Sequence, residues 1–126
     1  MSIKKKKILV VEDEETLASV YAQLLKEHGY APRVATSGQE GVDQIKKGGW
    51  DLILLDIMMP KIDGLEVLGQ LAPEDRAKNG PIIMLTVLAQ ETIVAQALKA
   101  GASGYIIKSD VDFGELLKIV NEFLEN

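Results

Sequence analysis

The sequence predicts an α/β fold, a doubly wound, five-stranded parallel sheet built as (βα)5 with strand order 2-1-3-4-5. Short apolar runs alternate five times with longer amphipathic segments, a pattern typical of parallel strands joined by helical crossovers. Most of the runs are almost entirely apolar, which indicates strands buried on both faces. The chain has 126 residues, 47% of them apolar, which fits one domain, 1–126, with a substantial core.

Each expected strand is a run of four or five mostly apolar residues. The five runs are 7–11, 31–35, 51–55, 81–85 and 104–107. The second run is the most polar and contains Pro32, so we place it at an edge of the sheet. In the order 2-1-3-4-5 the first and third strands are neighbours, and ligands bind at the carboxyl ends of such a pair.

The segments between the runs have apolar residues at helical spacing. We expect helices over residues 14–28, 65–71, 90–100 and 112–124. A further helix is expected to begin at a Ser37 cap and to end at residue 47. Ser37 and Glu40 form a capping-box pattern, in which the hydroxyl accepts from a helix amide and Glu40 reaches back to the cap. Residues 72–80 are expected to form a polar loop. The residues expected to face inward on the fourth helix are Ile93, Val94, Ala97 and Leu98. On the first helix the residues at helical spacing are Leu17, Val20, Tyr21 and Leu24, and on the last helix one face carries Phe113, Leu116, Leu117, Val120 and Leu124.

Composition excludes several classes of protein. The chain has no cysteine and a single histidine, which excludes disulfides, thiolate metal sites and histidine-rich zinc sites. Its net charge of −5 argues against direct nucleic-acid binding, and we interpret Lys4–Lys7 as solvated charge. No apolar run reaches the roughly 18 residues of a membrane span. No secretory signal precedes the first strand, so we expect a soluble, cytoplasmic protein without a membrane partner.

Acidic residues follow two expected strands that are neighbours in the sheet. Glu12 and Asp13 follow run 7–11, and Asp56 follows run 51–55. Carboxylates that converge at one sheet edge repel one another, and a small divalent cation such as Mg²⁺ relieves the repulsion. Taken alone, Glu12 and Asp13 are equally well explained as negative charge at the start of a helix. That explanation does not account for Asp56.

A hydroxyl and an ammonium are expected at the same edge. Thr86 follows run 81–85, and Lys108 follows run 104–107. Together they supply a donor and a positive charge suited to phosphate oxygens. Each alone has an ordinary explanation, a threonine bonded to backbone and a solvated lysine. The joint pattern favours a phosphate site.

These residues, with Asp56-Ile57-Met58-Met59-Pro60, Asp63-Gly64 and Tyr105, resemble the receiver domain of two-component response regulators over the whole chain. The resemblance implies a flavodoxin-like fold. It also implies that Asp56 accepts a phosphoryl group from a phosphohistidine on a histidine kinase or histidine phosphotransfer protein. The implied Mg²⁺ ligands are Glu12, Asp13, Asp56 and the backbone carbonyl of Met58.

The resemblance also assigns roles to three residues near the phosphoryl group. Lys108 is implied to pair with that group, Thr86 to bond it after transfer, and Tyr105 to turn inward as Thr86 moves. Phosphorylation is implied to change the surface formed by 90–100, 104–107 and 112–124. That surface is implied to bind a downstream protein target or a second copy of the chain in a homodimer. The protein is expected to gain and lose its own phosphoryl group rather than turn over an external substrate. Without the resemblance, Tyr105 is explained as an ordinary strand aromatic.

Three positions depart from the commonest family pattern. Glu12 stands where aspartate is usual, Val87 where a small residue is usual, and Ser109 where a cis proline is usual. These departures keep open a pseudo-receiver, a protein-binding module that is never phosphorylated. An aspartyl-phosphate hydrolase is a further alternative, but such enzymes typically carry a second aspartate two residues after the nucleophile, where this chain has Met58.

Overall fold

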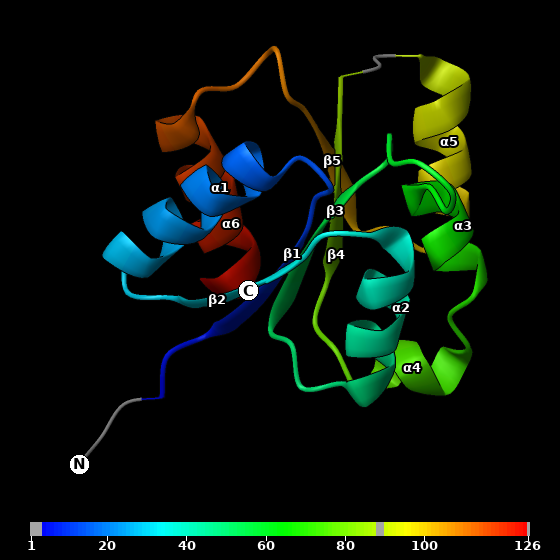
Figure 1. Ribbon diagram of the computed structural model, residues 1–126, viewed down its shortest axis with the longest axis horizontal. Helices are drawn as coiled ribbons and strands as arrows, with labels where there is room; N and C mark the ends of the chain where they lie inside the picture. The colour runs from blue at the N-terminus through cyan, green and yellow to red at the C-terminus, as the bar shows by residue number, and fades with distance from the viewer. Residues whose placement is uncertain (1–3, 88–89, 126) are drawn as a thin grey trace.

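The computed structural model describes residues 4–87 and 90–125, which form one parallel sheet between two layers of helices (Figure 1). The strand order is β2-β1-β3-β4-β5, as predicted. The strands are β1 Lys7–Val11, β2 Ala31–Ala35, β3 Leu52–Asp56, β4 Ile82–Thr86 and β5 Gly104–Ile107. β3 and β4 run one residue further along the chain than predicted. Asp56 and Thr86 are therefore the last residues of their strands.

Helices cover both faces of the sheet. They are α1 Glu15–Glu27, α2 Gly38–Lys47, α3 Gly64–Gly69, α4 Pro73–Ala77, α5 Glu91–Lys99 and α6 Phe113–Glu125. α1 and α6 pack on one face, and α2, α3 and α5 on the other (Figure 1). Among the described residues, no helix has the length and apolar character needed to cross a bilayer.

The core has two apolar layers because successive residues of a strand point to opposite faces. On β3, Leu52 and Leu54 pack towards α1 and α6, whereas Ile53 and Leu55 pack towards α2 and α3. All four side chains are fully buried. This two-sided burial explains why the run is apolar without interruption, and it leaves Asp56 as the residue where β3 reaches the sheet edge.

The prediction of an irregular loop over 72–80 is wrong, because α4 forms at its centre. Contacts with distant residues stabilise this short helix. Asp75 pairs with Lys46 of α2 at 2.9 Å, and the guanidinium of Arg76 donates to the carbonyl oxygen of Ala100 after α5. α4 lacks an apolar helical repeat of its own, so its stability depends on tertiary contacts.

Three local predictions are also wrong. Leu98 of α5 is 44% exposed rather than inward-facing, and Phe113, expected on the buried stripe of its helix, is equally exposed. At α2, the Ser37 hydroxyl accepts from the Glu40 amide at 3.1 Å, as predicted. The Glu40 carboxylate, however, accepts from the amide of Thr36, one residue before the cap.

The loop after β3 returns tightly onto the end of that strand. The Gly64 amide donates to the carbonyl oxygen of Ile57 at 2.9 Å. A Cβ added to Gly64 would lie 2.4 Å from the carbonyl oxygen of Asp56, which belongs to the backbone and cannot move aside. A glycine is therefore needed where α3 begins beside the acidic strand end.

We expect Gly64→Ala to lower the free energy of unfolding by about 2 kcal/mol or more, because an overpacked contact forces the backbone apart. The matched control is Gly69→Ala, since a Cβ there meets nothing within 4 Å. That control is expected to be neutral or stabilising by about 0.5–1 kcal/mol. Urea denaturation of both variants measures the difference, and equal effects would show that the loop does not need the glycine.

Candidate functional site

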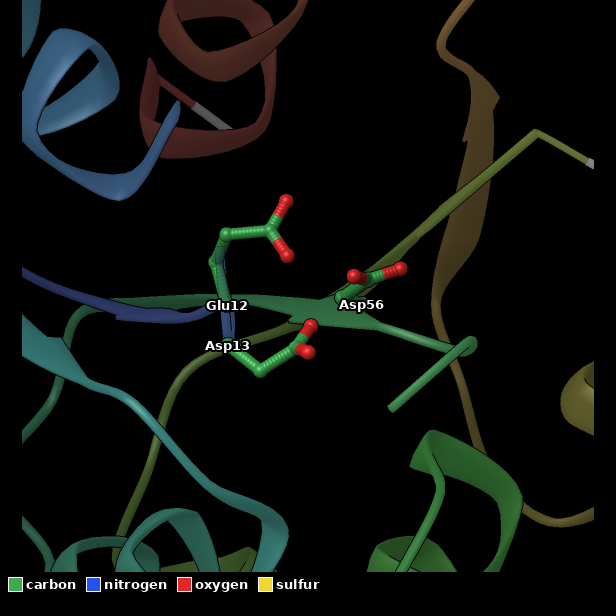
Figure 2. A group of neighbouring side chains, drawn as sticks. All are labelled: Glu12, Asp13 and Asp56. Atoms are coloured by element: carbon green, nitrogen blue, oxygen red, sulfur yellow. The ribbon is translucent and has the colours of Figure 1, made fainter. Parts of the chain in front are cut away.

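Three carboxylates gather at the carboxyl edge of the sheet, between the ends of β1 and β3 (Figure 2). β1 and β3 are hydrogen-bonded neighbours, with Val11 opposite Leu55, so the residues that follow them emerge side by side. One oxygen each from Glu12, Asp13 and Asp56 lie within 4.8 Å of one another. The structure thus brings together the three acids that the sequence placed at one edge.

Lys108 supplies the positive charge at this edge. Its Nζ lies 2.7 Å from Oε1 of Glu12 and 3.3 Å from Oδ2 of Asp56. Its backbone amide donates to the carbonyl oxygen of Thr86 at 2.7 Å, which fixes the start of the loop after β5. The Lys108–Ser109 peptide bond is trans. Serine at position 109 is thus compatible with a lysine that reaches both acids.

Burial makes these charges costly and shifts their pKa values. Glu12 is only 1% exposed, and burial, together with the nearby Asp56, raises the pKa of its carboxyl above the ordinary 4.5, against the opposing effect of Lys108. Burial alone lowers the pKa of the Lys108 ammonium, but its hydrogen bond to Glu12 and the charge of Asp56 outweigh that effect and raise it above 10.5. Lys108 therefore stays charged throughout the physiological range.

The two oxygens of Asp56 have different partners. Oδ2 faces Lys108, while Oδ1 accepts from the backbone amide of Met58 at 3.2 Å. The resemblance assigned a role only to the carbonyl of Met58, so this contact of its amide was not predicted. A signal was available, because aspartate side chains often bond the backbone two residues further along. The bond holds the carboxylate of Asp56 in one orientation at the strand end.

The remaining predicted residues lie at different distances from the acids. Thr86 is fully buried at the end of β4, the strand that pairs with β3. Tyr105 is 45% exposed and lies outside the acidic cluster, in a shallow groove with Val94 and Leu98 of α5. The structure therefore brings Thr86 to the same sheet edge as Asp56 and leaves Tyr105 on the outer surface.

The donor set fits a small, hard divalent cation. Three carboxylates offer oxygen ligands only, and none of the described residues brings a thiolate or imidazole to the cluster. One lysine against three acids leaves net negative charge at the edge, which a divalent cation would neutralise. Because Glu12 is bonded to Lys108, a cation must share or displace that contact to use Glu12 as a ligand.

The chain is similar in sequence to known proteins. The family model described as the response regulator receiver domain matches residues 8–121. The uncharacterized transcriptional regulatory protein YkoG of Bacillus subtilis is 39% identical over 106 residues, 84% of this chain and 46% of that protein. The chain spans less than half the length of the curated relatives it matches.

The fold is also similar to that of solved response regulator structures. A response regulator receiver domain protein (CheY-like) from Methanospirillum hungatei is 32% identical, with a TM-score of 0.87 over 97% of this chain and 95% of that one. The response regulator TrrA from Thermotoga maritima, solved in complex with Mg²⁺ and BeF, is 35% identical. Its TM-score is 0.81 over 94% of this chain and 99% of that one.

The raised pKa of Glu12 predicts a specific pH dependence of stability. Between 4.5 and its raised value the folded protein binds more protons at this group than the unfolded chain does. The stabilising contribution of Glu12 is therefore complete below pH 4.5 and is lost as pH rises through the raised value.

The measured quantity is the free energy of unfolding of the wild type minus that of Glu12→Gln. We expect this difference to fall as pH rises from below 4.5 towards neutrality. Glutamine keeps the shape of the side chain but does not titrate, so the subtraction removes the contributions of other groups. Urea denaturation at a series of pH values in the absence of divalent cations measures this difference. A difference that is flat or that increases with pH contradicts the assignment.

Proposed function

The chain belongs to the response regulator receiver domain family, and on that basis we propose that it is a phospho-accepting signalling switch. Asp56 takes a phosphoryl group from a phosphohistidine on a histidine kinase or histidine phosphotransfer protein. The observation that carries the proposal is the pairing of Lys108 with Glu12 and Asp56, at 2.7 and 3.3 Å, in a cluster of three carboxylates. Residues 1–126 act as a single receiver domain, located in the cytoplasm.

The proposed cofactor is Mg²⁺, held by Glu12, Asp13, Asp56 and the backbone carbonyl of Met58. When bound, the ion neutralises charge on the oxygens of the group in transfer. The cluster of carboxylate oxygens within 4.8 Å supports this ligand set. TrrA, which is 35% identical to this chain, was solved with Mg²⁺ and BeF, which supports the same choice of cation here.

The chain's own residues position the reacting atoms. An oxygen of Asp56 attacks phosphorus, its new O–P bond forms, and the P–N bond to the donor imidazole breaks. The Met58 amide, 3.2 Å from Oδ1, orients the carboxylate. Lys108 then turns its charge from the carboxylates to the phosphoryl oxygens, and the Thr86 hydroxyl donates to one of them. The protein modifies itself and has no external substrate to turn over.

The proposed output is a change on the surface formed by α5, β5 and α6. Tyr105 and Leu98 are both more than two fifths exposed on this surface and border a groove of about 220 Å³. Inward movement of Tyr105, following Thr86 towards the phosphoryl group, would remove an aromatic side chain from that groove. A downstream protein or a second copy of the chain binds one form of this surface in preference to the other.

The acceptor residue is tested by intact-mass measurement after incubation with acetyl phosphate and Mg²⁺. We expect a mass increase of one phosphoryl group in the wild type and none in Asp56→Asn, because the amide is not a nucleophile for phosphorus. Tyr30→Phe, far from the acidic edge, is the control for folding and handling. Identical masses for wild type and Asp56→Asn would instead favour a pseudo-receiver, and repeated release of phosphate from esters would favour a hydrolase.

The metal site is tested by calorimetric titration with Mg²⁺. Asp13→Asn is expected to weaken the affinity by about tenfold or more, because a charged ligand is replaced by a neutral one. Asp43→Asn removes the same charge from the exposed surface of α2 and is the matched control. Equal losses in the two variants would indicate general electrostatic attraction rather than a defined site.

A further inference from the structure

A cavity lies beside Lys108, which is one of its lining residues. It has a volume of about 280 Å³ and is bounded by α1, the ends of β4 and β5, and the start of α6. A loop joins the end of β5 to the start of α6 (Figure 1), and Val111 and Asp112 of that loop line the cavity. Apolar walls come from Leu17, Leu85, Ile106 and Leu116. We call this space the Tyr21 cavity, after the tyrosine that lines it.

Tyr21 brings a polar group into this apolar space. The residue is only 5% exposed, burial raises the pKa of its hydroxyl above 10.0, and that hydroxyl has no hydrogen-bond partner within the part of the chain that the structure describes. Among the described residues, every fully enclosed side-chain nitrogen or oxygen has a hydrogen-bond partner. The Tyr21 hydroxyl therefore opens onto accessible space, and the space that this side chain lines is the cavity. A hydroxyl that is accessible from an apolar space and has no protein partner is available to donate to, or accept from, a molecule bound there.

An aromatic pair shapes the cavity. The rings of Tyr21 and Phe113 meet edge to face, with centroids 5.9 Å apart and an interplanar angle of 77°. Phe113 is 44% exposed although it lines the cavity, so one side of its ring remains available at the mouth. Aromatic rings in this arrangement favour contact with another flat molecule.

The charges at the cavity favour an uncharged occupant. Lys108 lines the cavity, but its ammonium is engaged by Glu12 and Asp56. Asp112, also at the lining, would repel an anion. An engineered apolar cavity of roughly 150 Å³ is known to hold benzene, so this larger space accommodates one or two rings.

We propose that the Tyr21 cavity binds a small, flat, uncharged organic molecule that carries one hydrogen-bonding group, recognised by the Tyr21 hydroxyl. Such a molecule contacts the wall that carries Lys108. If Asp56 is the phosphoryl acceptor, occupancy alters how readily Lys108 leaves the carboxylates, and that consequence alone rests on the proposed function. Binding itself depends on neither Mg²⁺ nor a phosphoryl donor.

The test uses the full chain, ¹⁵N-labelled and free of Mg²⁺, titrated with phenol, indole and benzyl alcohol. We expect saturable shifts of amide resonances at positions 17, 21, 113 and 116, with affinities of about 0.1–1 mM, as usual for so few atoms. Tyr21→Phe keeps the ring and is expected to weaken binding by about fivefold, the effect of one hydrogen bond. Val111→Trp, which places a large side chain at the lining, is expected to abolish it.

Tyr30→Phe is the matched control, because it removes the same hydroxyl group at the other end of α1, where Tyr30 bonds Asn121. Its affinity for the probes should equal that of the wild type. Absence of saturable shifts with all three probes, or an affinity that Tyr21→Phe leaves unchanged, overturns the proposal. Because no phosphoryl chemistry enters this measurement, its failure would leave the assignment of Asp56 standing.

Discussion

The Lys108 ammonium is the charge that allows buried carboxylates to share one sheet edge. Glu12 and Asp56 are 1% and 3% exposed and come from adjacent strands, and Lys108 lies 2.7 and 3.3 Å from them. A buried charge without a partner is strongly destabilising, so the site depends on this lysine when no cation is bound. The lysine comes from beyond β5, two strands away from β3, and its contacts tie β1, β3 and β5 together at that edge.

The same lysine connects the two spaces at this end of the molecule. Its ammonium contacts Glu12 and Asp56 of the acidic cluster, and the same residue lines the Tyr21 cavity. In the proposed cycle a divalent cation takes over the neutralisation of Glu12 and Asp56, which frees Lys108 for the phosphoryl oxygens. In that cycle the position of one ammonium group would distinguish the resting site from the phosphorylated one, and the proposed occupant of the cavity would contact the same residue.

The sequence predicted the sheet and the acidic edge because both rest on local patterns. Continuous apolar runs located all five strands to within one residue, and parallel topology placed Glu12, Asp13, Asp56 and Lys108 together. α4 was missed because its stability comes from distant contacts such as Arg76 with Ala100. The Tyr21 cavity was missed because helical spacing places Tyr21 and Phe113 on apolar faces but does not reveal the space between α1, the loop before α6 and the ends of β4 and β5.

The proposed cycle requires a divalent cation to replace Lys108 as the partner of the carboxylates. A crystal structure of the chain with Mg²⁺ and a beryllium fluoride phosphate mimic is the most direct test of that replacement. We expect an ion bonded to Glu12, Asp13, Asp56 and the Met58 carbonyl, with Lys108 Nζ moved from Glu12 to a fluorine atom of the beryllium fluoride group on Asp56. A structure grown under those conditions with the 2.7 Å Lys108–Glu12 contact intact and no ion among the acids would contradict it.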